Sequence, residues 1–155
     1  MSQQFYLKSL LGRLARSSFR AGFHLSRADI EVIRRKGLAT VRRHAREIVA
    51  ERLAPAEIPN DGRQTPWRGY PVFVAQHACA CCCRGCLFKW QGIPKDRALT
   101  EAEVESVTAL LSAWIEGELR RAGLDPAALE DPAPGGEAGK PVPADDGSGM
   151  DSLFE

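Results

Sequence analysis

All five cysteines of this 155-residue chain lie within eight consecutive positions, from Cys79 to Cys86. Cysteines so close in sequence cannot link distant parts of a chain through disulfides, so an apolar core has to hold the fold together. Hydrophobic residues make up 44% of the chain, which is enough for one globular domain. The cysteines are therefore left for metal binding, for thiol chemistry or for close packing.

Apolar residues outside that cluster recur at helical spacing, and no segment alternates as a strand does. Ser26 with Asp29, and Thr100 with Glu103, have the spacing of capping boxes, which open helices. These patterns predict a small, compact all-α domain of about four to five helices. We expect them near residues 7–14, 27–37, 38–54, 76–90 and 101–123.

The chain also divides by charge. Residues 1–123 contain 20 Lys and Arg against 12 Asp and Glu, and residues 124–155 contain 1 against 8, which gives net charges of +8 and −7. The second part holds five of the ten prolines and few large apolar residues, so it cannot bury enough surface to offset its ordering entropy. We therefore expect a helical cysteine-cluster domain in 1–123 and a disordered acidic tail in 124–155.

The tail ends in a short apolar motif, Leu153 and Phe154, which follows an Asp and a Ser. This motif resembles the peptide through which bacterial proteins bind the sliding clamp, although Met150 stands where that peptide usually has glutamine. The sliding clamp is thus one expected partner. The alternatives are a plain apolar chain end, or an acidic tail that folds over the basic body and screens it.

The first 20 residues lack the apolar core of a secretory signal, and no stretch approaches the roughly 20 apolar residues of a membrane span. Their Arg and Ser content fits a transit peptide or a basic amphipathic first helix. We expect a cytoplasmic protein without a membrane partner. Because thiols are mostly reduced in that compartment, the cysteines favour metal or reactive-thiol chemistry over structural disulfides.

The cysteine segment offers metal ligands at useful spacing. If residues 76–90 form one helix, Cys79, Cys82, Cys83 and Cys86 share one stripe, and they also form two adjacent C-x-x-C units, which suit zinc. One straight helix cannot surround an ion tetrahedrally, so other ligands have to come from elsewhere. Zinc is the first metal expected and an iron–sulfur cluster the alternative. The candidate ligands are Cys83 and Cys86 first, then Cys82, His77 and His44, with His24, a carboxylate or a second copy of the chain as further sources.

Two other roles for the cysteines stay open. Small side chains on one helix face let a neighbouring helix approach closely, so the thiols fill space in that case. Alternatively, a Cys83 or Cys86 thiolate beside Arg84, His77 or His44 is the reactive group of an enzyme or redox sensor. For His44, a hydrogen bond between helices is the favoured role and metal ligand or base the alternative. The sequence does not decide whether the chain is an enzyme, and it does not give the oligomeric state.

Basic residues gather in the second and third predicted helices. Such a surface attracts phosphates, so nucleic acid is a second expected partner. The alternative is a set of solvated helix faces without a partner. The residues concerned are Arg34, Arg35, Lys36, Arg42 and Arg43.

The strings "KGLATVRRHAREIVAERLAPAEIPNDGRQTP" and "RGYPVFVAQHACACCCRGCLFKWQGIPKDRALT" resemble the bacterial family known as domain of unknown function 4186. The similarity extends over about residues 11–118. His77, Cys82, Cys83, Cys86, Lys89 and Trp90 match the family motif. Cys79 and Cys81 stand where the family tends to have threonine, and Gln91 stands in place of a histidine.

The resemblance implies a small intracellular bacterial protein and supplies no activity. Combined with the residues themselves, it leads to a metal-binding helical domain that acts on or near nucleic acid. The alternative is a thiol-dependent enzyme or redox sensor.

Overall fold

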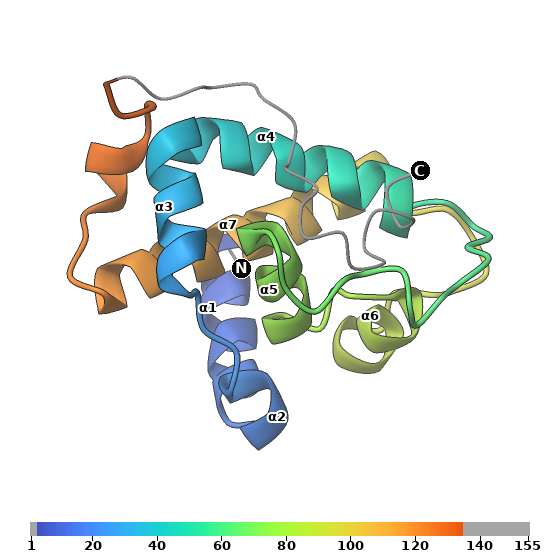
Figure 1. Cartoon of the computed structure of the whole chain (residues 1–155). Helices are drawn as coiled ribbons and strands as arrows, with labels where there is room; N and C mark the ends of the chain where they lie inside the picture. Colours follow the sequence, from blue (N-terminus) through green and yellow to red (C-terminus); the bar gives the residue numbers. More distant parts are fainter. Residues whose placement is uncertain (1–2, 135–155) are drawn as a thin grey trace.

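The computed structural model describes residues 3–134, and every regular element in this range is helical (Figure 1). The all-α prediction is confirmed. The described part has more helices than the four or five predicted, because a one-turn helix follows the first one and the predicted cysteine helix is divided in two. The elements are α1 Gln3–Ala15, α2 Ser18–Ala21, α3 Arg27–Lys36, α4 Leu38–Ile48 with a π-helical turn at Val49–Leu53, α5 Pro71–Ala78, α6 Arg84–Gln91, α7 Glu101–Arg121, and a 3₁₀ turn at Pro126–Leu129.

Both predicted capping boxes form. The Ser26 side chain accepts a hydrogen bond from the Asp29 amide and the Asp29 carboxylate accepts one from the Ser26 amide, which opens α3. Thr100 and Glu103 make the same reciprocal pair at the start of α7. Each box satisfies amides that the first helical turn leaves without partners, so the helix starts are fixed by local sequence.

The core forms around α7, the longest helix, which crosses the molecule behind α5 (Figure 1). Helices α1, α4 and α5 all pack against α7. Val107 and Leu111 of α7 are fully buried, as are Val41 of α4 and Val72 of α5. The apolar stripes that predict the helices are thus the faces that meet in the core.

The packed body extends past the predicted boundary at residue 123. Leu129 of the 3₁₀ turn is buried, and Glu130 accepts hydrogen bonds from Arg42 at 2.9 Å and from the Ala39 amide at 3.1 Å. Gly37 makes this contact feasible, because its φ is 88° and a Cβ there would lie 2.8 Å from the Pro132 nitrogen. Leu153 and Phe154 of the predicted clamp motif lie outside the described residues.

Among residues 3–134, no helix has both the length and the apolar character needed to cross a lipid bilayer.

Candidate metal centre

The prediction of one continuous cysteine helix is wrong. Helix α5 ends at Ala78 and α6 begins at Arg84, and between them Ala80 takes a left-handed conformation with φ 57°. Side chains from outside hold this turn: the Thr65 hydroxyl donates to the Cys82 carbonyl at 2.7 Å, and the Gln76 amide donates to the Cys81 carbonyl at 3.1 Å. These tertiary contacts override the helical preference of the segment.

The turn brings three thiols together. The sulfurs of Cys82, Cys83 and Cys86 all lie within 4.8 Å of one another. Cys83 is the N-cap residue of α6, and its sulfur accepts a hydrogen bond from the Cys86 amide at 3.4 Å. The helix N-terminus therefore faces the sulfurs with amide donors and a positive dipole end, both of which stabilise thiolates. Cys79, the remaining member of the predicted stripe, is not part of this group.

A buried arginine from α2 contacts the same sulfurs. Arg20 is 8% exposed, and its Nη2 donates to Cys86 Sγ at 3.2 Å while its Nη1 lies 3.9 Å from Cys82 Sγ. Nη1 also donates to the His77 carbonyl at 2.6 Å. Within residues 3–134 the guanidinium has no carboxylate partner, and the groups in contact with it that can carry a negative charge are the Cys82 and Cys86 sulfurs.

The three thiols differ in acidity. Hydrogen bonds from Cys82 and Cys83, together with those from Arg20, hold the pKa of the Cys86 thiol well below its ordinary value. The hydrogen bonds that Cys82 donates to Cys83 and Cys86, together with burial, raise the pKa of Cys82. Of the three thiols, Cys86 is thus the one whose surroundings favour the thiolate form.

The donor set fits a metal ion. Three thiolates bound tetrahedrally to Zn²⁺ at about 2.3 Å have sulfurs roughly 3.8 Å apart. The three sulfurs here lie within 4.8 Å, so closure by about 1 Å or less brings them to ligand distance. The cluster is thus suited to hold a metal ion with three protein ligands.

His77 lies beside the cluster without joining it. Its Nε2 donates to the carbonyls of Thr65 at 3.2 Å and Pro66 at 3.1 Å, so Nδ1 carries no proton. Nδ1 is buried and has no hydrogen-bond partner among the described residues. Burial lowers the pKa of this histidine and keeps the ring neutral. Nδ1 is not among the atoms within 4.8 Å, so it is a ligand only if the ring moves.

His44, the other predicted histidine ligand, contacts Tyr70. Its Nδ1 lies 2.6 Å from the Tyr70 hydroxyl, and burial lowers the pKa of the ring. The hydrogen bond between α4 and the residue preceding α5 is the role that the sequence favours. The cluster of sulfurs does not include His44.

Cys79 and Cys81 are packed in the core, and burial raises the pKa of both thiols, that of Cys81 to about 12. Gln91 donates to Cys81 Sγ at 3.8 Å and accepts from the Tyr6 hydroxyl at 2.9 Å. Gln91 therefore contacts a core cysteine and adds no ligand to the three-thiol group.

The arginine predicted to activate the thiols has another role. The Arg84 side chain is 2% exposed and donates hydrogen bonds to the carbonyls of five residues. These hydrogen bonds connect the end of the π-helical turn to the loop before α7. Arg20 supplies the positive charge beside the thiols instead, and no sequence signal marks it, because α2 is a single turn. The five carbonyls belong to Leu53, Ala54, Pro55, Pro94 and Arg97.

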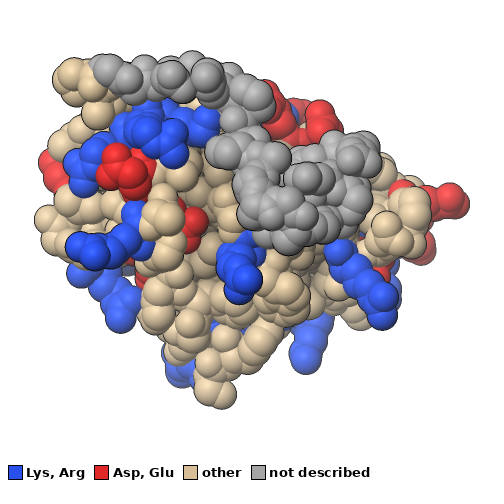
Figure 2. Space-filling view, viewed as in Figure 1, with Lys and Arg blue, Asp and Glu red and all other residues tan. Residues whose placement is uncertain are grey.

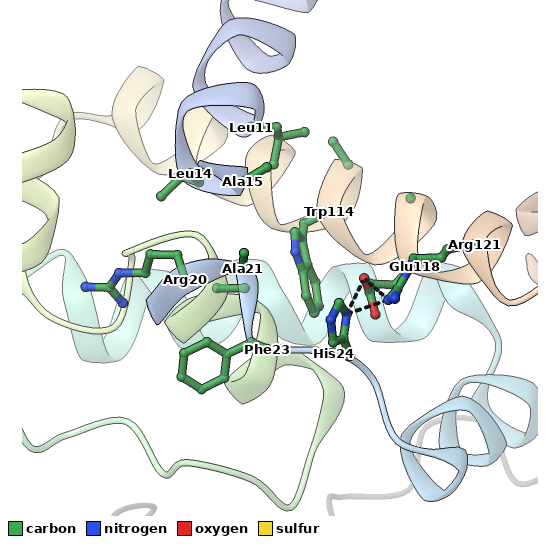
Figure 3. A pocket seen from close by; sticks show the side chains of 13 residues that line it. Leu11, Leu14, Ala15, Arg20, Ala21, Phe23, His24, Trp114, Glu118 and Arg121 are labelled. Carbon is green, nitrogen blue, oxygen red and sulfur yellow. Dashed lines mark hydrogen bonds and ion pairs between the residues drawn. The ribbon is translucent and has the colours of Figure 1, made fainter. Parts of the chain in front are cut away.

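A cavity of about 500 Å³ lies next to Arg20, and the three cysteines of the cluster do not line it (Figure 3). Phe23 and Trp114 line its middle, while Arg20 points away from the polar group at the opposite end. In that group His24 Nδ1 lies 3.1 Å from a Glu118 oxygen. His24, which the sequence offered as a further ligand, is therefore engaged elsewhere.

The basic residues predicted to bind nucleic acid mostly have acidic partners. Arg34 pairs with Glu31 at 3.5 Å, Arg42 with Glu116 and Glu130, and Arg43 with Glu47 at 4.0 Å. Lys36 is buried, with 1% exposure, and Arg35 is exposed. Figure 2 accordingly shows blue and red side chains interspersed over the part of the surface where α3 and α4 lie.

Comparison with known families places these residues in a shared domain. The family model described as "Domain of unknown function (DUF4186)" matches residues 8–116. The match includes the three cysteines of the cluster, Arg20 and His77. No solved structure matches the chain.

Proposed function

The chain belongs to the DUF4186 family, and because that description names no activity, we propose a function from the site itself: zinc binding by Cys82, Cys83 and Cys86 in a protein that acts on or near nucleic acid. The observation that supports this most strongly is the convergence of three sulfurs to within 4.8 Å of one another at the N-terminus of α6.

Charge supports the same proposal. Three thiolates and Zn²⁺ together carry one negative charge, which the buried Arg20 guanidinium balances. A buried charge without a partner costs several kcal/mol, so an anionic centre stabilises Arg20 as much as Arg20 stabilises the centre. His77 keeps a neutral ring with an unprotonated Nδ1 close by, which suits a proton acceptor.

Zinc is favoured over an iron–sulfur cluster. Clusters of that kind are usually held by four cysteines, and the two remaining cysteines pack in the core away from the three-thiol group. Three protein ligands leave one position free on a tetrahedral ion, and when bound, zinc supplies a Lewis acid there and cross-links the turn to α6. The Cys86 amide orients the Cys83 sulfur, and Arg20 balances the negative charge of the centre.

A thiol enzyme or redox sensor is the second candidate, and the 3.2 Å contact between Arg20 and Cys86 favours it. In this function the Cys86 thiolate attacks an electrophile. With hydrogen peroxide, the Cys86 thiolate displaces hydroxide from one peroxide oxygen as the O–O bond breaks, which leaves a sulfenic acid, and the hydroxide takes up a proton from solvent to become water. Cys82 or Cys83 then forms the disulfide and releases a second water.

Metal content by elemental mass spectrometry separates the two candidates. Untagged protein purified without chelator or added metal is expected to carry about one zinc per chain, with three thiols protected from alkylation. Cys83→Ser and Cys86→Ser should lose the metal, whereas Cys79→Ser, the matched control, should keep it. Circular dichroism of each variant separates loss of ligand from loss of fold.

A protein without metal in which one thiol alkylates far faster than the other four contradicts the zinc proposal. If Cys86→Ser abolishes that reactivity, the thiol function takes its place.

A further inference from the structure

Four rings form a connected aromatic group on one side of the molecule, and we call it the aromatic platform: Phe19 of α2, Phe23 after it, Trp67 of the loop before α5, and His77 of α5. Two members are largely exposed to solvent, Phe19 by 55% and Trp67 by 60%. A contiguous patch of large exposed aromatic side chains is typical of a ligand-binding or interaction surface.

The platform is rigid. The Trp67 ring stacks on His77 at 4.0 Å with 12° between the planes, and the Thr65 and Pro66 carbonyls fix the His77 ring. Phe23 lies nearly parallel to Trp67, with ring centroids 6.2 Å apart and 7° between planes. Phe19 contacts Phe23 edge to face. An exposed indole held in this way loses little conformational entropy when a ligand stacks on it.

Unpaired arginines flank the platform. Trp67 and His77 line a hollow of about 1370 Å³ together with Arg63 and Arg68. Within the described part of the chain, neither of these exposed guanidinium groups has an ion-pair partner, in contrast to Arg34, Arg42 and Arg43. The one carboxylate of the hollow, Asp29, is occupied by the capping box of α3.

We propose that the aromatic platform binds single-stranded nucleic acid, with bases stacked on Trp67 and Phe19 and phosphates at Arg63 and Arg68. Exposed aromatic rings beside unpaired arginines suit single-stranded nucleic acid, because the bases of a single strand have free faces that stack on the rings while its phosphates bind the arginines. A duplex hides those faces within its own stack. The inference rests on the proposed function, and it moves the nucleic-acid surface from α3 and α4 to the platform.

The platform lies next to the thiol cluster. Arg20 donates to the His77 carbonyl at 2.6 Å and contacts the Cys86 and Cys82 sulfurs with the same guanidinium group. Arg20 therefore connects the backbone of one platform residue, His77, to the candidate metal centre.

Fluorescence anisotropy with a labelled 15-nucleotide oligothymidylate tests the stacking. Full-length, metal-loaded protein is expected to bind it, and Trp67→Ala should weaken binding on the order of tenfold. Trp67→Phe should restore most of the affinity, because it keeps an aromatic face. Phe88→Ala is the matched control, since Phe88 is 52% exposed and does not line the hollow.

Salt dependence tests the phosphate contacts. Each phosphate contact on a single strand contributes about 0.7 to the slope of log affinity against log salt. Arg63→Gln and Arg68→Gln should each reduce the slope by about that amount. Arg35→Gln, the control on α3, should leave it unchanged.

Equal affinity for a duplex of the same length, or full affinity in Trp67→Ala and Phe19→Ala, overturns the proposal. Loss of binding in Arg35→Gln with none in Arg63→Gln also overturns it and returns the surface to α3. Zinc content and thermal melting of each variant are measured alongside. If Trp67→Ala fails to fold, the affinities of Phe19→Ala, Arg63→Gln and Arg68→Gln for the single strand test the proposal instead. A wild-type protein that holds zinc but binds no single strand refutes this inference alone and leaves the metal centre intact.

Discussion

Arg20 is the residue whose removal tests the candidate metal centre most directly. Arg20→Met keeps most of the apolar stem but removes the donors to Cys86 Sγ and Cys82 Sγ, at 3.2 and 3.9 Å. It also removes the donor to the His77 carbonyl. Because Arg20 is not itself a ligand, the three sulfurs remain available and the metal is still able to bind.

The size of the effect follows from these contacts. A hydrogen bond to a charged group contributes about 1.5 to 3 kcal/mol, which corresponds to roughly 10- to 150-fold in affinity. Only the 3.2 Å contact is at full strength, so the lower half of this range applies. Mutation of residues that hydrogen-bond to metal ligands typically lowers metal affinity by about 10- to 100-fold, in agreement with the range worked out from the hydrogen bond. We expect zinc affinity to fall by about 10- to 50-fold in Arg20→Met.

Competition against a chromophoric zinc chelator at fixed pH measures this change. Arg16→Met is the matched control, because Arg16 is exposed and forms no ion pair among the described residues. Arg20→Lys keeps the charge without the forked geometry and should fall between wild type and Arg20→Met. Unchanged zinc affinity in Arg20→Met refutes the view that Arg20 balances an anionic centre.

Three other predictions concern the remainder of the chain. Arg84→Met removes the donor that five carbonyls share, of which Ala54 keeps the Leu99 amide, and should lower the free energy of unfolding by about 3 to 5 kcal/mol in urea titration, while a loss below about 1 kcal/mol contradicts this. The Arg97 hydrogen bonds lower the pKa of Glu103 to about 2, so this pair stabilises the fold fully above the ordinary Glu pKa and its contribution is lost as pH falls toward 2. The melting temperature of Arg97→Ala should therefore fall less steeply with acid than that of wild type, and equal slopes refute it. Deletion of residues 152–155 should abolish capture by immobilised sliding clamp, and unchanged capture removes the clamp as a partner.

The sequence by itself determined the parts of the structure that depend on near neighbours. Both capping boxes join residues three positions apart, so the starts of α3 and α7 follow from local pattern. The helical faces follow from the spacing of apolar residues. These features are visible in the sequence because each is settled within a turn or two of helix.

Only the tertiary structure decided how these elements form a site. The turn at Ala80 depends on Thr65, which binds the Cys82 carbonyl from 17 positions away. Arg20 precedes Cys86 by 66 positions, and its one-turn helix is too short to have an apolar stripe from which the sequence could predict it. The platform likewise draws Phe19, Trp67 and His77 from three separate segments. Such contacts form because helices packed around α7 bring distant segments together, and no local preference of the chain encodes that arrangement.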